Sequence, residues 1–255
     1  MAPASPATTW ERGVELGARG RYAEAAEHFA ELLGVDDRWK SLALSSLASH
    51  RRQIGDAVGA ADLDAVALLS ATDAESCADA LIGLAADAVA SGDPARATVW
   101  HVESAEPATS GWRTLTRWHW VGAELALLAG DEATATEHAQ RAIATCLDHS
   151  VRHAVKSRIV LAAVTGDIDD LVAVRPILSS EGWVTLEWPL ALVAADHGGS
   201  AELPPSPSWP GEAWEAGRVA TYTIEECLPA ALQPVWRSHP GVQRLREDGL
   251  PSGGE

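Results

Sequence analysis

The apolar residues fall into alanine-rich runs at helical spacing, and glycines interrupt these runs at a nearly constant interval. Each of these glycines is followed by arginine or aspartate, and successive ones are 35, 37, 38 and 36 residues apart: Gly20, Gly55, Gly92, Gly130 and Gly166. Glycine readily takes the left-handed conformation that ends a helix, and repetition at a period of this length is typical of helical-repeat arrays. The pattern therefore predicts five helix pairs, with one glycine between the two helices of each pair.

Small residues mark the expected contact between the two helices of a pair. The side chains at a helix contact set the distance between the helix axes, so small residues predict close packing. The fifth pair departs from the pattern with Ile159 and Leu171, and Ala191, seven residues before Gly198, predicts a sixth, half unit. In the other pairs, the position seven residues before the glycine holds Gly13, Ala48, Ala85 or Ala123, and the position five residues after it holds Ala25, Ala60, Ala97 or Ala135.

Capping residues and helix breakers set the predicted boundaries. Thr8 or Thr9 can cap the first helix, and the Arg175-Pro176 step is expected to shorten or kink the second helix of the fifth pair. The predicted pairs cover residues 8–19 and 22–33, 38–53 and 57–69, 74–90 and 94–106, 112–129 and 132–147, and 151–165 and 168–178, followed by a single helix over 183–195.

Composition divides the chain into five segments. Residues 1–7 and 247–255 are expected to be disordered, 8–197 to form the helical repeat domain, 198–211 a Pro/Gly-rich linker and 212–246 a C-terminal helical segment. We expect this last segment to cap the open end of the array, because terminal repeats need covering; folding into the groove is the alternative. Its apolar face consists of Ile224, Leu228, Leu232, Val235 and Trp236.

The first helix pair resembles the tetratricopeptide repeat. The resemblance implies an all-α fold: a right-handed superhelical array of about five helix-turn-helix repeats with a C-terminal helical extension. It also implies that the first helix of each pair lines a concave groove. That family's carboxylate clamp is not expected, because Trp10 and Val14 replace its Lys and Asn. The resemblance rests on Gly13, Leu16, Gly20-Arg21-Tyr22, Ala25, Phe29 and Leu32.

If the resemblance holds, the positions ten and six residues before each glycine face the groove. They are Trp10 and Val14, Ser45 and Ser49, Ile82 and Ala86, Trp120 and Glu124, and Lys156 and Val160. The position thirteen residues before the glycine adds Arg117 and His153. The positions three and two residues before it add Arg52 and Gln53. The candidate partner-binding residues are therefore Arg52, Arg117, Trp120, Glu124, His153 and Lys156.

These candidates concentrate positive charge beside an indole. Such a groove suits an acidic peptide, or a carboxyl terminus with an apolar side chain, because charge steers the ligand and the indole supplies contact area. The alternative is that the cations pair with the abundant carboxylates and the tryptophans belong to the core. Trp112, Trp118 and Trp120 lie within nine residues and cannot share one core stripe, so at least one is expected to be exposed or at an interface.

The net charge of −17 argues against general binding to nucleic acids or to anionic membranes. The basic residues are 17 Arg and two Lys, a bias typical of GC-rich bacterial genomes. Three widely spaced cysteines indicate reduced thiols in a reducing compartment. No signal peptide or membrane-spanning run is recognised, so a cytoplasmic location is expected.

No catalytic or cofactor motif emerges from the sequence. The chain contains no Gly-x-Ser-x-Gly, Walker A or GxGxxG pattern. His149 and His153 are four residues apart beside Asp148, but they lack a third ligand, and Arg152 and Lys156 would repel a metal ion. We therefore expect no cofactor, no metal and no enzymatic activity.

The expected function is that of a scaffold or adaptor that binds a segment of a protein or peptide partner in its groove. The alternative is a regulatory sensor that binds a small acidic ligand, with the C-terminal segment as its switch.

Overall fold

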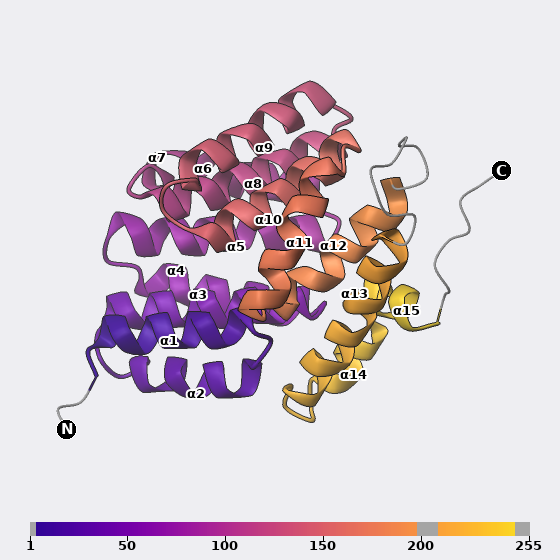
Figure 1. Ribbon diagram of the computed structural model, residues 1–255. Coiled ribbons are helices and arrows are strands. Elements are labelled where there is room, and N and C mark those ends of the chain that lie inside the picture. Colours follow the sequence, from indigo (N-terminus) through magenta and orange to yellow (C-terminus); the bar gives the residue numbers. More distant parts are fainter. Residues whose placement is uncertain (1–3, 198–208, 248–255) are drawn as a thin grey trace.

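The computed structural model describes residues 4–197 and 209–247, and within these ranges it contains helices and no strand (Figure 1). Consecutive helices pack against one another. The helices that form pairs are α1 (Pro6–Ala18) and α2 (Tyr22–Leu32), α3 (Asp37–Gln53) and α4 (Ala57–Ser70), α5 (Ala74–Ala90) and α6 (Pro94–Glu103), α8 (Trp112–Leu128) and α9 (Glu132–Cys146), and α10 (Val151–Thr165) and α11 (Asp169–Glu181). The remaining helices are α7 (Ala105–Ala108), α12 (Val184–His197), α13 (Trp209–Glu226), α14 (Gln233–Ser238) and α15 (Pro240–Glu247).

The repeated glycines separate the paired helices, as predicted. All five have positive φ angles, between 73° and 92°. At three of the turns the aspartate that follows the glycine then caps the second helix by accepting a hydrogen bond from a backbone N–H; these caps are Asp56, Asp93 and Asp131. Gly182, which ends α11 with a φ of 68°, lies outside the period and was not predicted as a turn.

The small residues lie where the paired helices meet. Ala25, Ala60, Ala97 and Ala135 are completely buried. In the first pair, a Cβ atom added to Gly13 would lie 2.6 Å from the ring of Phe29. The predicted close packing of the pairs is therefore confirmed.

Several boundaries differ from the prediction. Ser5, and not Thr8 or Thr9, caps α1. The helix therefore begins at Pro6, inside the segment 1–7 that was predicted to be disordered. Pro176 lies inside α11, which continues past it to Glu181. The C-terminal helical segment begins at Trp209, inside the predicted linker 198–211. Residues 198–208, and all but the first residue of the predicted tail 247–255, lie outside the described residues.

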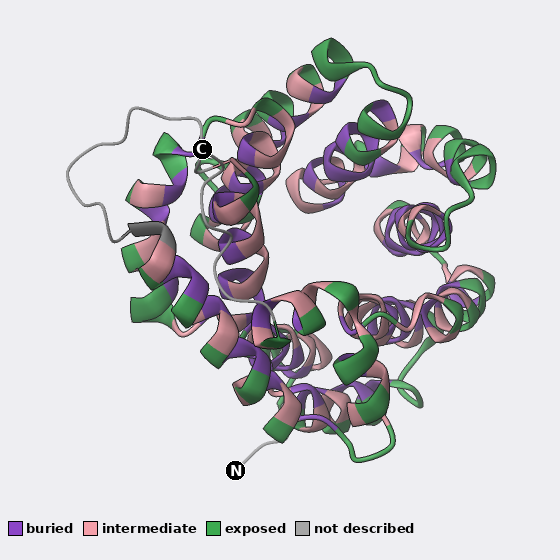
Figure 2. Cartoon of the chain, turned by 90° about the vertical axis from the view of Figure 1, so that its right-hand side faces the viewer, coloured by how far each residue is buried: buried purple, intermediate pink, exposed green. Residues whose placement is uncertain are grey.

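The row of helices closes on itself, because α12 contacts α1. The hydroxyl of Thr185 in α12 donates a hydrogen bond of 2.8 Å to the carbonyl oxygen of Ala18 in α1. Figure 2, which is turned by 90° from Figure 1, shows the helices arranged around a central space. The first and last helices of the row are thus neighbours.

The C-terminal segment packs along α12 and also reaches the first two helix pairs. The backbone N–H of Ala23 donates a hydrogen bond to the carbonyl oxygen of Cys227. Three of the five residues of the predicted apolar face are buried against these neighbours, because Ile224, Leu228 and Trp236 pack with Tyr22 and Ile54 in one hydrophobic cluster. Leu232 and Val235 are half-buried. The segment therefore covers the junction between the last helix and the first pairs.

Candidate functional site

The helices surround a cavity of about 150 Å³. Its walls come from α1, α3, α5, α8 and α10, the first helices of the five pairs, and from α12. The lining residues are Trp10, Val14, Gly17, Ala18, Ser45, Ser46, Ser49, His50, Gln53, Asp79, Arg113, Arg117, Trp120, Arg152, His153, Lys156, Thr185 and Leu186.

The charge of this lining is opposite in sign to that of the protein. Arg113, Arg117, Arg152 and Lys156 face the cavity, whereas Asp79 is the one carboxylate that the described part of the chain contributes to the lining. The whole chain carries a net charge of −17. A positive cavity inside an acidic protein attracts a negatively charged ligand, because a cleft lined by one sign of charge focuses the electric field of that charge.

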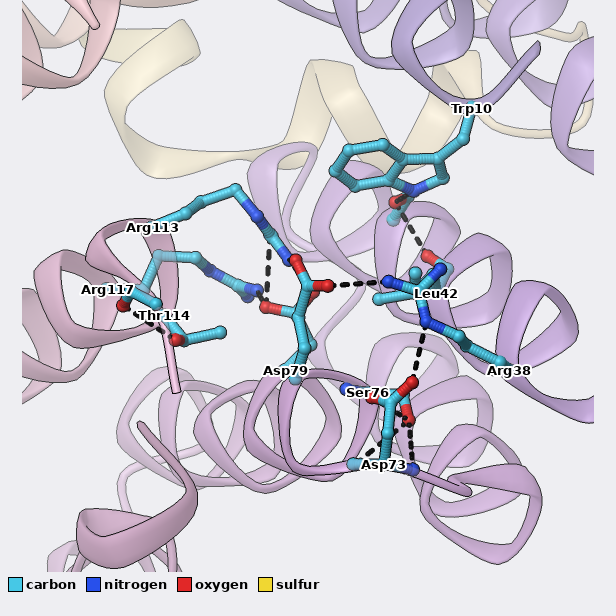
Figure 3. Close-up of polar contacts among 12 residues, drawn as sticks. Trp10, Arg38, Leu42, Asp73, Ser76, Asp79, Arg113, Thr114 and Arg117 are labelled. Atoms are coloured by element: carbon cyan, nitrogen blue, oxygen red, sulfur yellow. Dashed lines mark hydrogen bonds and ion pairs between the residues drawn. The ribbon is translucent and has the colours of Figure 1, made fainter. Parts of the chain in front are cut away.

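Asp79 holds two of the guanidinium groups in place (Figure 3). Arg113 donates hydrogen bonds of 3.1 and 2.5 Å to the two carboxylate oxygens, and Arg117 donates to one of them. Burial alone would raise the pKa of Asp79, but the charges of Arg113 and Arg117 outweigh it and lower the pKa. Glu75 also accepts a hydrogen bond of 3.1 Å from Arg113. Arg113 and Arg117 are therefore fixed before any ligand arrives.

Arg152 lacks such a partner. Within the part of the chain that the structure describes, no carboxylate lies within ion-pairing distance of its guanidinium. Burial lowers the pKa of Arg152; the more distant Glu15 opposes this effect and Arg113 adds to it. The pKa of Arg117 is also lowered, by burial and by its cationic neighbours, despite Asp79. The cavity thus holds positive charge that its own carboxylate does not balance.

Lys156 extends into the cavity over an indole. Its Nζ atom lies 4.0 Å from the centre of the Trp120 ring. Trp120 itself is buried and donates a hydrogen bond of 2.8 Å from Nε1 to the hydroxyl of Ser157. Lys156 stays exposed to the cavity, but the surrounding helices limit its hydration and lower its pKa to about 8; Glu124 opposes this effect, and nearby guanidinium groups, first that of Arg117, add to it.

His153 lies between two indoles. Its ring is 5.0 Å from that of Trp112 and 5.5 Å from that of Trp120. Burial, followed by the charge of Arg152, lowers the pKa of His153 to about 2, so the imidazole is neutral. His153 was predicted to add positive charge; it adds an aromatic surface instead.

Four of the six candidate residues line the cavity together: Arg117, Trp120, His153 and Lys156. Arg52 does not line it. It lies behind the wall, paired with Asp64 at 2.8 Å and Asp87 at 2.5 Å. Glu124 is also outside the lining, although its charge acts on Lys156 and Arg52.

The sequence prediction missed Arg113, Arg152 and Asp79 as site residues. Their positions carried a usable signal, because residues four apart share a helix face. Arg113 precedes Arg117 by four residues, and Arg152 precedes Lys156 by four. Asp79 stands thirteen residues before Gly92, the position that Arg117 and His153 occupy in their own units.

None of the three clustered tryptophans is exposed. Trp112 stacks on His149, with ring centres 5.3 Å apart, and Trp118 donates a hydrogen bond of 3.0 Å from its indole to the carbonyl oxygen of His101. Trp120 faces the cavity. A histidine ring lies against each of the three indoles, so the expected exposure does not occur in the chain by itself.

Within the described ranges, no group of three or more His, Cys, Asp or Glu side chains is placed to hold a metal ion. Over the same ranges, no helix has the length and apolar character needed to cross a membrane. Comparison with protein-family models, with curated proteins and with solved structures finds no significant match.

Proposed function

We propose that this protein is a tetratricopeptide-like array of about five repeats, wound in a right-handed superhelix, that binds a small acidic ligand in its central cavity without catalysing a reaction. The observation that carries the proposal is the cavity lining, in which four cationic side chains face one carboxylate inside a protein with a net charge of −17. The overall charge makes nucleic acids and anionic membranes unfavourable partners. A cytoplasmic location fits its three free cysteines.

The size of the cavity favours a small ligand. A cavity of about 150 Å³ is of the size that holds benzene in another protein. The contact of α12 with α1 joins the two ends of the row of helices, so that helices surround the cavity. A compact acid with one or two carboxylates therefore fits better than an extended segment.

The lining residues supply distinct interactions with such an acid. Arg113 and Arg117, held by Asp79, present oriented N–H donors, and a carboxylate pairs well with the planar guanidinium group. Arg152 and Lys156 provide positive charge that the carboxylate of the lining does not balance. Binding an anion offsets part of the desolvation cost of these groups, which favours association.

A second candidate is the scaffold or adaptor that binds a partner protein. The apolar walls formed by Trp10, Val14 and Leu186 favour a ligand with an apolar side chain beside its carboxylate. The last residue or two of an acidic partner combine these features. In this version the carboxyl terminus of the partner enters the cavity while the remainder lies outside.

The C-terminal segment is suited to respond to the ligand. Thr185 and Leu186 of α12 line the cavity, while the same helix packs along α13. A ligand that changes the position of α12 would therefore alter how the C-terminal segment is held. This arrangement supports the proposal that the segment acts as a switch.

The proposal is tested by calorimetry and thermal unfolding with acetate, succinate, citrate and a short peptide that ends in either a free carboxylate or an amide. We expect a carboxylate to bind the wild-type chain and to bind Arg152→Gln at least about tenfold more weakly. The matched control is Arg141→Gln, because Arg141 lies on the surface in an exposed pair with Glu137. Binding by the free-carboxylate peptide alone would favour the partner-binding candidate, and a chain that binds none of these acids would contradict both candidates.

A further inference from the structure

The chain contains two lysines, and they occupy very different places. Lys40 lies in α3 and is absent from the cavity lining, whereas Lys156 is the only lysine in the lining. Within the described residues Lys156 has no carboxylate at ion-pairing distance and no hydrogen bond; its close contact is the face of Trp120. Its amine is therefore accessible to a molecule in the cavity.

A lysine in this position offers a property that the neighbouring arginines do not. The guanidinium group stays protonated, whereas the lysine amine can lose its proton and act as a nucleophile. Three arginines already supply permanent positive charge to the lining. In a chain with two lysines and 17 arginines, one more cation at this position would not require a lysine.

The surroundings of Lys156 favour the neutral amine. The side chain of Lys156 is exposed to the cavity, but the ring of helices around it limits the hydration of the amine and lowers its pKa to about 8; Glu124 opposes this effect, and the guanidinium groups of Arg117, Arg152 and Arg52 add to it. At pH 7 about a tenth of the amine is then neutral, compared with roughly one part in 2,500 for an ordinary lysine. A lysine placed beside other cations is a recognised form of activated nucleophile.

We propose that Lys156 forms a reversible imine with a small oxo acid whose carboxylate is held by the guanidinium groups of the cavity. This inference rests on the proposed function, the binding of a small acid, and adds the chemical class of the ligand. The ligand is a 2-oxo acid, in which the carbonyl carbon is directly bonded to the carboxylate that Arg152 and Arg117 attract. Holding the two groups together in the cavity favours the reaction by proximity.

The reaction needs no oxidant and no second substrate. The lone pair of Nζ attacks the carbonyl carbon, a carbon–nitrogen double bond replaces the carbon–oxygen double bond, and the oxygen leaves as water. Starting from the protonated amine, two of its three protons leave with the oxygen, and the third remains on the iminium nitrogen. The iminium keeps the positive charge near the bound carboxylate.

The test is reductive trapping. The full chain is incubated with pyruvate or with 2-oxoglutarate in the presence of cyanoborohydride, and the modified residue is located by peptide mass spectrometry. We expect a stable adduct on Lys156, formed at least about tenfold faster than any adduct on Lys40. Lys40→Arg should still form the adduct, whereas Lys156→Arg, which keeps the positive charge, should lose it.

Equal labelling of the two lysines, or no adduct on Lys156 with either oxo acid, would overturn the inference. Thermal unfolding with succinate, which has no carbonyl group, separates this failure from that of the proposed function. If succinate and 2-oxoglutarate stabilise the wild-type chain but no adduct forms, the cavity binds acids and the imine is refuted. If neither acid stabilises the chain and no adduct forms, both proposals are wrong.

Discussion

The hydroxyl of Thr185 donates a hydrogen bond to the carbonyl oxygen of Ala18, joining residues that are 167 positions apart in the chain. Both residues are buried and both line the cavity. The bond connects α12 to the C-terminal end of α1, where the carbonyl groups have no partner within the helix. One hydrogen bond thus joins the two ends of the row of helices at the wall of the candidate site.

Thr185→Val should weaken this closure without changing the size of the side chain. The buried carbonyl oxygen of Ala18 would lose its donor, which costs about 1–3 kcal/mol in the free energy of unfolding. Urea denaturation measures this change. The control is Thr98→Val, because Thr98 is exposed and its hydroxyl bonds within its own helix, to the carbonyl oxygen of Pro94. Equal effects of the two substitutions would show that the closure contributes nothing specific.

The helix pairs could be predicted from the sequence because their determinants are local. A glycine at a fixed period and small residues at fixed distances from it, such as Ala25 and Ala60, report on contacts within about 30 residues. The closure could not be predicted in this way. Nothing in the sequence near Thr185 indicates that its partner is Ala18, because that contact depends on the accumulated geometry of all the helices between them.

Asp79→Asn should destabilise the protein strongly. Asp79 is buried between Arg113 and Arg117, and the neutral amide would leave Arg117 without an ion-pairing carboxylate among the described residues and Arg113 with Glu75 alone. The expected cost is about 3–5 kcal/mol in the free energy of unfolding at pH 7. Because the pKa of Asp79 is lowered in the folded state, its contribution is present above the ordinary aspartate pKa and is lost as the pH falls through the folded value.

Asp87→Asn is the matched comparison for the loss of stability expected from Asp79→Asn. Asp87 and Asp64 are both buried and share one guanidinium, that of Arg52, and burial raises the pKa of both carboxyl groups. An asparagine resembles the protonated acid and leaves one carboxylate for one guanidinium, so we expect a cost below about 1 kcal/mol. A larger loss for Asp87→Asn than for Asp79→Asn, measured by urea denaturation at pH 7, would contradict this account of the two clusters.

Arg152→Gln should stabilise the protein in the absence of ligand. The guanidinium of Arg152 is half-buried and, among the described residues, has no carboxylate at ion-pairing distance, so only the more distant Glu15 offsets part of its desolvation cost. Removing the charge should raise the free energy of unfolding by about 1 kcal/mol, as is common where a residue serves binding at the expense of stability. The measurement is the Tm of Arg152→Gln in thermal unfolding, with Arg141→Gln as the control variant. A lower Tm for Arg152→Gln alone would mean that Arg152 is a structural residue.

The sequence predicted some of the residues that share the candidate site, but it did not predict which of their charges are paired. The register of the repeat brought Arg117, Trp120, His153 and Lys156 to one surface in the prediction, and they do share the cavity. The same register cannot show which cations acquire a buried partner. Arg52 does so through Asp64 on a neighbouring helix, whereas Arg152 does not, and this difference depends on side-chain placement across helices.

The buried histidines should make the protein less stable as the medium is acidified from pH 6.5 towards pH 5. Burial lowers the pKa of His119 to about 4, that of His50 to about 3 and that of His153 to about 2. The unfolded chain takes up protons at these residues below about pH 6.5, while the folded chain does not. Each histidine therefore lowers the free energy of unfolding by about 1 kcal/mol per pH unit in this window.

His119→Asn isolates one of these contributions. The Nδ1 atom of His119 lies 3.0 Å from Nδ1 of His138, and an asparagine keeps a hydrogen-bonding atom near that position. Urea denaturation at pH 5, 6 and 7 should give a slope that is about 1 kcal/mol per pH unit shallower than that of the wild type. An unchanged slope would mean that His119 is protonated in the folded protein, contrary to its burial.

Gly17→Ala should disturb the cavity from the opposite wall. A Cβ atom at this position of α1 would lie 2.7 Å from Cε1 of His50, so the imidazole would have to move. His50 packs on Tyr22 and Phe29, with ring centres 4.6 and 5.7 Å apart, and the displaced ring would lose these contacts or enter the cavity. We expect a loss of about 1–3 kcal/mol in the free energy of unfolding, together with weaker binding of any acid that occupies the cavity.

Gly34→Ala is the control, because no atom lies within 4 Å of its added Cβ, and it should change stability by less than about 0.5 kcal/mol. If Gly17→Ala is as mild as Gly34→Ala in both measurements, the close approach of α1 to His50 does not shape the site.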